Sequence, residues 1–171
     1  MVMKPWCTAL LALSLLGNMF RPHLNSLPWI QMDAAFQVPH GMFWPVLALN
    51  LLLAGVPIEL RLGRLALMAG WTLPLLVQRW LQLPPSPLLA GLSLVVILLI
   101  VSYRQSEPLP RKVWLTLGVL EAFTLWLLAP HFLALIATLV CAAAVAWNVR
   151  TEAVSVLGLA SAMAWMLLWL S

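Results

Sequence analysis

One acidic residue, Glu121, stands in the middle of an apolar stretch, where an ionised side chain is costly. A carboxylate at that depth has to be paired, protonated or in contact with water. It could therefore act as a proton or cation site, or as a polar anchor for a substrate or a partner helix. The structural alternative is a protonated glutamate that hydrogen-bonds to a neighbouring helix. The stretch holds no second carboxylate, so both interpretations stay open.

Two further polar residues, Arg79 and Asn50, lie in other apolar stretches and complete the candidate ligand or proton site with Glu121. Pro74 removes the amide that would bond to the Gly70 carbonyl. A kinked polar stretch ending at Arg79 would suit the lining of a cavity. Alternatively, Arg79 extends to the membrane interface, or it pairs with Glu121 or with a lipid headgroup. Asn50 would then hydrogen-bond to a neighbouring helix.

The spacing of histidine, cysteine and acidic residues in the sequence does not match that of a known metal or cofactor site. No histidine lies inside a predicted span for a b-type haem, and no lysine for a retinal-type Schiff base. Neither a Gly-x-Ser-x-Gly motif nor a phosphate-binding glycine loop occurs. The sequence therefore predicts no cofactor and no catalytic residue. The weak candidates for a zinc or copper site are four residues of one predicted layer: His23, His40, His131 and Asp33.

The elements that must position these residues are apolar helices. Hydrophobic residues make up 64% of the 171 residues and charged residues 8%, whereas soluble domains hold about 45–50% and roughly 25%. The mean hydropathy is +1.01. A bilayer core requires about 20 residues of helix. The sequence predicts an all-α polytopic membrane protein, a single integral membrane domain over 1–171, with seven transmembrane helices at 5–20, 41–58, 65–83, 88–103, 113–129, 132–149 and 153–170.

The charged residues lie mostly between these spans and predict an orientation. With a cytoplasmic N-terminus, the outer side receives only Arg21 and Arg79, and the C-terminus lies outside. Because the basic residues lie at helix ends, the formal charge of +4 does not indicate a nucleic-acid partner. Three acids among arginines are interpreted as solvated interface charges: Glu59, Glu107 and Glu152. The cytoplasmic side receives the other basic residues: Lys4, Arg61, Arg64, Arg104, Arg111, Lys112 and Arg150.

Local patterns predict how the spans are covered and packed. Residues 26–37 in the first outer loop are expected to form a short amphipathic surface helix, with Trp29, Met32 and Phe36 on its apolar face. Short connections elsewhere predict that consecutive spans are antiparallel neighbours. Small residues on one face of the sixth span predict close packing there: Ala134, Thr138, Cys141, Ala142 and Val145.

These observations narrow the function only to a class. The lack of catalytic motifs and the abundance of leucine and tryptophan favour a non-catalytic integral subunit, or an assembly or accessory factor, of a larger bacterial inner-membrane complex. Its expected partners are the lipid bilayer and other integral membrane subunits. The alternative is a small-molecule or ion transporter that uses Glu121, Arg79 and Asn50. A membrane-embedded enzyme is the third interpretation.

Overall fold

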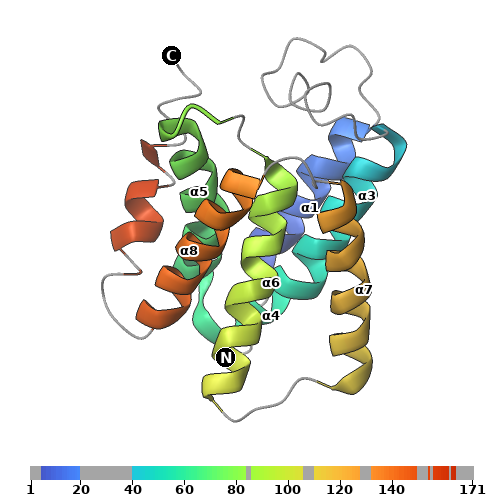
Figure 1. The fold of residues 1–171 in the computed structure, drawn as a ribbon. Helices are drawn as coiled ribbons and strands as arrows, with labels where there is room; N and C mark the ends of the chain where they lie inside the picture. Colours follow the sequence, from blue (N-terminus) through green and yellow to red (C-terminus); the bar gives the residue numbers. More distant parts are fainter. Residues whose placement is uncertain are drawn as a thin grey trace.

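The computed structural model describes residues 5–19, 40–83, 86–105, 110–127 and 132–149, together with positions 154, 156–161 and 163–164. The elements in these ranges are all helical (Figure 1), which confirms the predicted all-α class. They are α1 Trp6–Met19, α3 His40–Asn50, the π-helical turn η1 Leu51–Gly55, α4 Val56–Leu62, α5 Arg64–Trp80, α6 Pro87–Arg104, α7 Arg111–Leu127 and α8 Phe132–Asn148.

Within the described ranges, two helical stretches are long and apolar enough to cross a membrane, namely Pro45–Leu62 and Pro87–Arg104. The helix Phe132–Asn148 is apolar but shorter. The bounds of the described helices agree with the first six predicted spans to within a few residues, because charged and turn-forming residues interrupt the apolar runs. The crossing of a bilayer by seven helices remains a prediction.

Helix α6 lies at the centre of the bundle because its sequence is apolar on every side. It contains no charged residue from Pro87 to Tyr103, and most of its side chains are buried. It packs against α3, η1, α5, α7 and α8. In Figure 1, α5 and α8 lie on one side of α6 and α7 lies on the other.

The predicted packing of consecutive helices holds for α5 with α6 and for α6 with α7. It is wrong for α7 and α8, which lie on different sides of α6 (Figure 1). The main neighbours of α8 are α5 and α6 instead. A short connection joins the ends of two helices, but it does not force their sides together.

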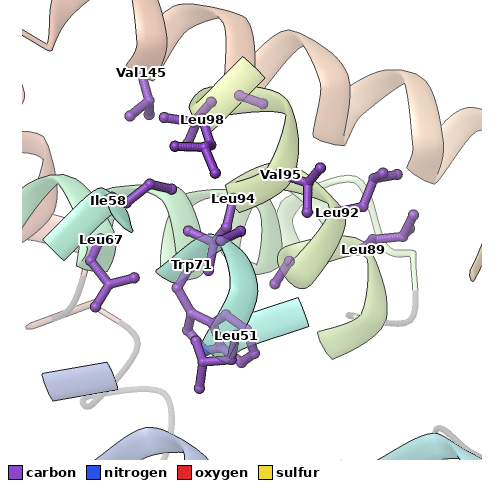
Figure 2. Packing of buried hydrophobic residues seen from close by; sticks show 14 of the residues in the cluster. Leu51, Ile58, Leu67, Trp71, Leu89, Leu92, Leu94, Val95, Leu98 and Val145 are labelled. Carbon is purple, nitrogen blue, oxygen red and sulfur yellow. The ribbon is translucent and has the colours of Figure 1, made fainter. Parts of the chain in front are cut away.

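Side chains from several helices meet in one apolar core (Figure 2). Ile58 of α4, Leu94 of α6 and Val145 of α8 belong to it and are fully or almost fully buried. The approach of α5 to α6 depends on Gly70, since a Cβ there would lie 2.7 Å from Ile97 Cδ1 and 2.8 Å from Leu94 Cδ2. A small residue lets two helix backbones approach closely and improves the van der Waals packing between them.

In the predicted second span, α3, the π turn η1 and α4 follow one another without a break and form one helical run. Pro57, which follows this turn, has no amide hydrogen for the Leu53 carbonyl, and its ring would clash with that carbonyl in a regular α-helix. A wider π turn relieves this clash. At the end of the turn, Gly55 approaches α1, because a Cβ there would lie 3.2 Å from Thr8 Cγ2.

Helix α8 uses its small residues for packing, as the sequence predicts. The face that it turns toward α5 and α6 is buried and consists of Ala134, Thr138, Cys141, Ala142, Val145 and Ala146. The predicted surface helix at 26–37, including Trp29, Met32 and Phe36, lies outside the described residues. The same is true of a large part of the predicted seventh span.

Candidate functional site

Glu121 lies on the inner face of α7, one turn after the buried Leu117. Its side chain keeps 9% of its surface exposed, and neither carboxyl oxygen has a hydrogen-bond partner among the described residues. If Glu121 had only a structural role, its carboxyl group would hydrogen-bond to a neighbouring helix. The described part of the chain shows no such hydrogen bond. An unpaired carboxyl group is costly to bury, so packing alone does not account for it.

Asn50 is a second buried polar side chain without a partner. It ends α3 at the π turn and is fully buried, and neither its amide nitrogen nor its oxygen is bonded to a described residue. Gly91 of α6 faces it, because a Cβ at Gly91 would lie 3.1 Å from Asn50 Cβ. The absence of a side chain at Gly91 thus lets α3 and α6 approach each other around the Asn50 amide. Further along α6, the buried Ser102 hydroxyl also lacks a described partner.

An open groove of about 560 Å³ lies beside α7, and neither Asn50 nor Glu121 lines it. The groove separates α3 and η1 from α7, and α7 packs against both α3 and α6. Its lining includes Leu49, which precedes Asn50, and Leu120, which precedes Glu121. The full lining is Leu49, Leu53, Leu115, Thr116, Val119 and Leu120.

Arg79 is not part of this arrangement. It is exposed near the C-terminal end of α5, beside the exposed Trp80, and it forms no ion pair with Glu121. The main neighbours of α5 are α4, α6 and α8. This position agrees with the alternative in which the Arg79 side chain extends to an interface.

Gln78, one residue earlier, joins neighbouring helices through hydrogen bonds. Its side chain is fully buried, and its Nε2 donates to Thr138 Oγ1 of α8 at 2.9 Å. Its Oε1 accepts from the Ser86 amide at 2.7 Å. Ser86 is the N-cap of α6, so Gln78 connects the end of α5 to both α6 and α8.

The carbonyl that Pro74 leaves free also has a partner. Ser93 Oγ of α6 donates to the Gly70 carbonyl at 2.9 Å. Two residues before Pro74, Thr72 Oγ1 lies 2.6 Å from the Ser161 hydroxyl near the C-terminus. The buried polar groups of Thr72, Gln78 and the Gly70 carbonyl on α5 therefore all bond to neighbouring segments.

A cluster of hydrogen bonds surrounds Glu59, and here the sequence interpretation is wrong. Glu59 was expected to be a solvated charge, but its side chain is fully buried. Its Oε1 accepts from the Cys7 amide at 3.1 Å, and its Oε2 accepts from the amide and the hydroxyl of Thr8 at 2.8 Å and 2.7 Å. The Arg64 Nε lies 3.4 Å from Oε1. Glu107 and Glu152 lie outside the described residues.

Glu59 caps the N-terminus of α1 from a distant part of the chain. The first amides of a helix have no acceptor within it, and Pro5 brings no capping oxygen before Trp6. A carboxylate satisfies these amides and interacts favourably with the positive end of the helix dipole. The bonds join residues 51 and 52 positions apart. One feature of the sequence could have indicated this contact. The first helix has no N-cap residue of its own and is predicted to begin on the same side of the membrane as Glu59.

At the end of α6 that adjoins α7, Arg104 joins two helix ends. Its guanidinium donates to the Ala146 and Trp147 carbonyls at 3.3 Å and 3.2 Å, and it lies 4.8 Å from the Trp147 ring centroid. A cation at a helix C-terminus neutralises the negative end of the dipole. Arg104 therefore links α6 to α8, and this contact gives Arg104 a structural role.

The metal candidates are not brought together in the described residues. His40 begins α3, whereas His23, His131 and Asp33 lie outside the described ranges. Those ranges contain no group of three or more histidine, cysteine, aspartate or glutamate side chains that could hold a metal ion.

Comparisons of the chain with protein-family models, with curated proteins and with solved structures give no match. Among the described residues, helix packing leaves unexplained the apolar groove beside α7 and three buried side chains without a hydrogen-bond partner, those of Asn50, Ser102 and Glu121.

Proposed function

We propose that the protein is a non-catalytic integral subunit, or an assembly or accessory factor, of a larger bacterial inner-membrane complex. The surface of the described helices supports embedding in a membrane. Soluble proteins rarely expose contiguous apolar patches larger than a few hundred Å², whereas hydrocarbon readily surrounds such side chains. The strongly exposed apolar residues include Leu10 and Leu13 of α1, Val119 of α7, and Phe132, Val140 and Trp147 of α8.

The positions of the basic residues support the same interpretation. Five exposed basic residues lie on helix ends that share one end of the bundle in Figure 1, and the exposed Arg79 lies near the opposite end, on the last turn of α5. The positive-inside rule places the end with five basic residues in the cytoplasm. These residues are Arg61, Arg64, Arg104, Arg111 and Lys112.

Cysteine labelling tests this orientation. In a variant without the native thiols, Leu81→Cys should react with an impermeant thiol reagent added to intact cells, because Leu81 is exposed at the predicted outer end. Pro110→Cys should react only after permeabilisation, because Pro110 is exposed at the predicted cytoplasmic end. Equal labelling of both positions from outside would contradict the orientation.

The apolar groove between α3–η1 and α7 is the observation that carries the accessory role. Thr116 is its one polar lining residue, and the Thr116 hydroxyl bonds to the Lys112 carbonyl of its own helix at 2.9 Å. Leu115 and Val119 are 60% and 71% exposed. A transmembrane helix of a partner could fill this groove with side chains, since close packing drives helix association in lipid. The groove offers no convergent polar groups for catalysis.

Site-specific photo-crosslinking tests the groove. A benzophenone amino acid at Val119 should give one discrete adduct with another membrane protein, whereas the same group at Val140, similarly exposed on α8, should not. Leu53→Trp would fill the groove from the α3–η1 side and should reduce the Val119 adduct several-fold. Equal adducts at both positions, or an adduct unaffected by Leu53→Trp, would exclude the groove as the interface.

A small-molecule or ion transporter is the second candidate function. It is favoured by one observation, that the buried side chains of Asn50 and Glu121 have no hydrogen-bond partner among the described residues. Intramembrane polar residues commonly mark ion and proton pathways. Arg79 no longer supports this candidate, because it is exposed at the end of α5.

A further inference from the structure

A small pocket of about 90 Å³ lies where α6 and α8 end next to each other, at the predicted cytoplasmic end of the bundle. Arg104 and Gln105 of α6 line it together with Trp147 of α8. We propose that this pocket binds the phosphate group of an anionic phospholipid. The rest of the lining consists of small or aliphatic residues, namely Val101, Ala146 and Val149.

Arg104 offers the edge of its guanidinium that matches a phosphate group. Its hydrogen bonds to the Ala146 and Trp147 carbonyls are both donated by Nη1. Nε and Nη2 have no acceptor among the described residues, and together they form a planar fork that pairs with two oxygens of a phosphate. The Trp147 ring, whose centroid lies 4.8 Å from the guanidinium, supports this orientation. The contacts that link α6 to α8 therefore also preorganise Arg104 for an anion.

The charge at this end of the bundle favours an anion. The five exposed basic residues named above share it, and the one acid that the described residues place there, Glu59, is buried and faces Arg64. The helix ends largely offset one another, because α1, α5 and α7 begin where α4, α6 and α8 end (Figure 1). Basic pockets between transmembrane helices on the cytoplasmic side bind the headgroups of acidic lipids.

The surroundings of the pocket favour a lipid over free phosphate as the source of the anion. Trp147 is 72% exposed, and Tyr103, which precedes Arg104, is 87% exposed. Such aromatic side chains are enriched at the level of lipid headgroups. Ala144 and Val140 are also exposed and continue the Trp147 face of α8 away from the pocket, at helical spacing. This face gives the acyl chains of a lipid an apolar path from the headgroup into the hydrocarbon.

Lipid binding goes beyond the accessory role. It rests on the proposed membrane embedding but not on a partner subunit, so the Val119 crosslinking experiment tests the accessory role separately. Native mass spectrometry of the protein purified in mild detergent gives the test, with phosphatidylglycerol and phosphatidylcholine titrated separately. One phosphatidylglycerol per chain should bind at least about tenfold more tightly than phosphatidylcholine, because the choline cation is repelled by the same basic residues.

Two variants with the same change in net charge assign the binding to the pocket. Gln105→Glu places a carboxylate in the lining and removes no hydrogen bond of the Gln105 side chain to a described residue. It should weaken phosphatidylglycerol binding at least about tenfold. Arg111→Gln removes one positive charge at the same end but outside the lining. It should weaken binding less than about threefold, since physiological salt screens exposed charges over about 8 Å.

Arg104→Lys covers the case in which Gln105→Glu fails to fold. It keeps the positive charge but replaces the planar fork with a single ammonium group, so it should weaken phosphatidylglycerol binding at least about threefold. Equal affinities for the two lipids, or equal weakening by Gln105→Glu and Arg111→Gln, would overturn the proposal. Inorganic phosphate provides the third arm. Saturable phosphate binding without a preference between the two lipids would assign the pocket to a free anion and overturn the lipid proposal.

Discussion

Replacing Glu59 with glutamine should lower the free energy of unfolding by about 3 kcal/mol, because it replaces a buried carboxylate that accepts three hydrogen bonds and mismatches those bonds. The carboxylate accepts from the amides of Cys7 and Thr8 and from the Thr8 hydroxyl. The glutamine NH₂ would face at least one of these donors, so one buried N–H group would lose its acceptor. Thermal or denaturant-induced unfolding in mild detergent measures the change.

Two matched variants separate the carboxylate cap from the ion pair. Arg64→Gln should cost less than about 1 kcal/mol, since the Arg64 side chain is 52% exposed and exposed pairs contribute little. Thr8→Ser keeps both the amide and the hydroxyl that donate to Glu59, so it should also be mild. If Arg64→Gln proved as harmful as Glu59→Gln, the ion pair and not the cap would hold α1 in place.

Replacing Gly158 with valine should cost about 2–3 kcal/mol, because a side chain at this position meets the main chain of another helix. A Cβ at Gly158 would collide with the Leu65 carbonyl oxygen at the start of α5. Backbone cannot move aside as a flexible side chain can, so the C-terminal segment would have to shift away from α5. Loss of the nearby Thr72–Ser161 contact should accompany the shift.

Gly118 of α7 provides the control for this substitution, since a Cβ there meets nothing within 4 Å. Gly118→Ala should be neutral or should stabilise the helix by about 0.5–1 kcal/mol, from its higher helix propensity. Comparing the two glycine variants by unfolding midpoint separates a packing effect from a propensity effect. Equal midpoints for Gly158→Val and Gly118→Ala would show that α5 and the C-terminal segment are not in close contact.

Local features of the sequence were sufficient to predict the helices and part of their packing. Charged and turn-forming residues interrupt the apolar runs, so the ends of α5 and α6 could be predicted to within a few residues. The small residues of α8 correctly predicted its buried face. Pro74 correctly predicted a free carbonyl at Gly70, since a missing amide is a covalent fact, and Ser93 proved to be its partner.

The partners of the polar residues depended on tertiary structure. A helix such as α6, which is apolar all round, carries no pattern that says which neighbour meets which face. The sequence therefore could not show that α7 and α8 lie on different sides of α6, or that Gln78 bonds to Thr138 and not to a ligand.

The same limit explains the contrast between the two acids, Glu121 and Glu59. The sequence alone determined that Glu121 lies deep in an apolar helix, because depth follows from counting residues along it. Only the tertiary structure decided that Glu121 has no described partner, and that Glu59, close to a helix end, is the buried acid with a complete set of partners. A hydrogen bond between residues 51 positions apart depends on how helices rotate and pack, and no local pattern encodes that geometry.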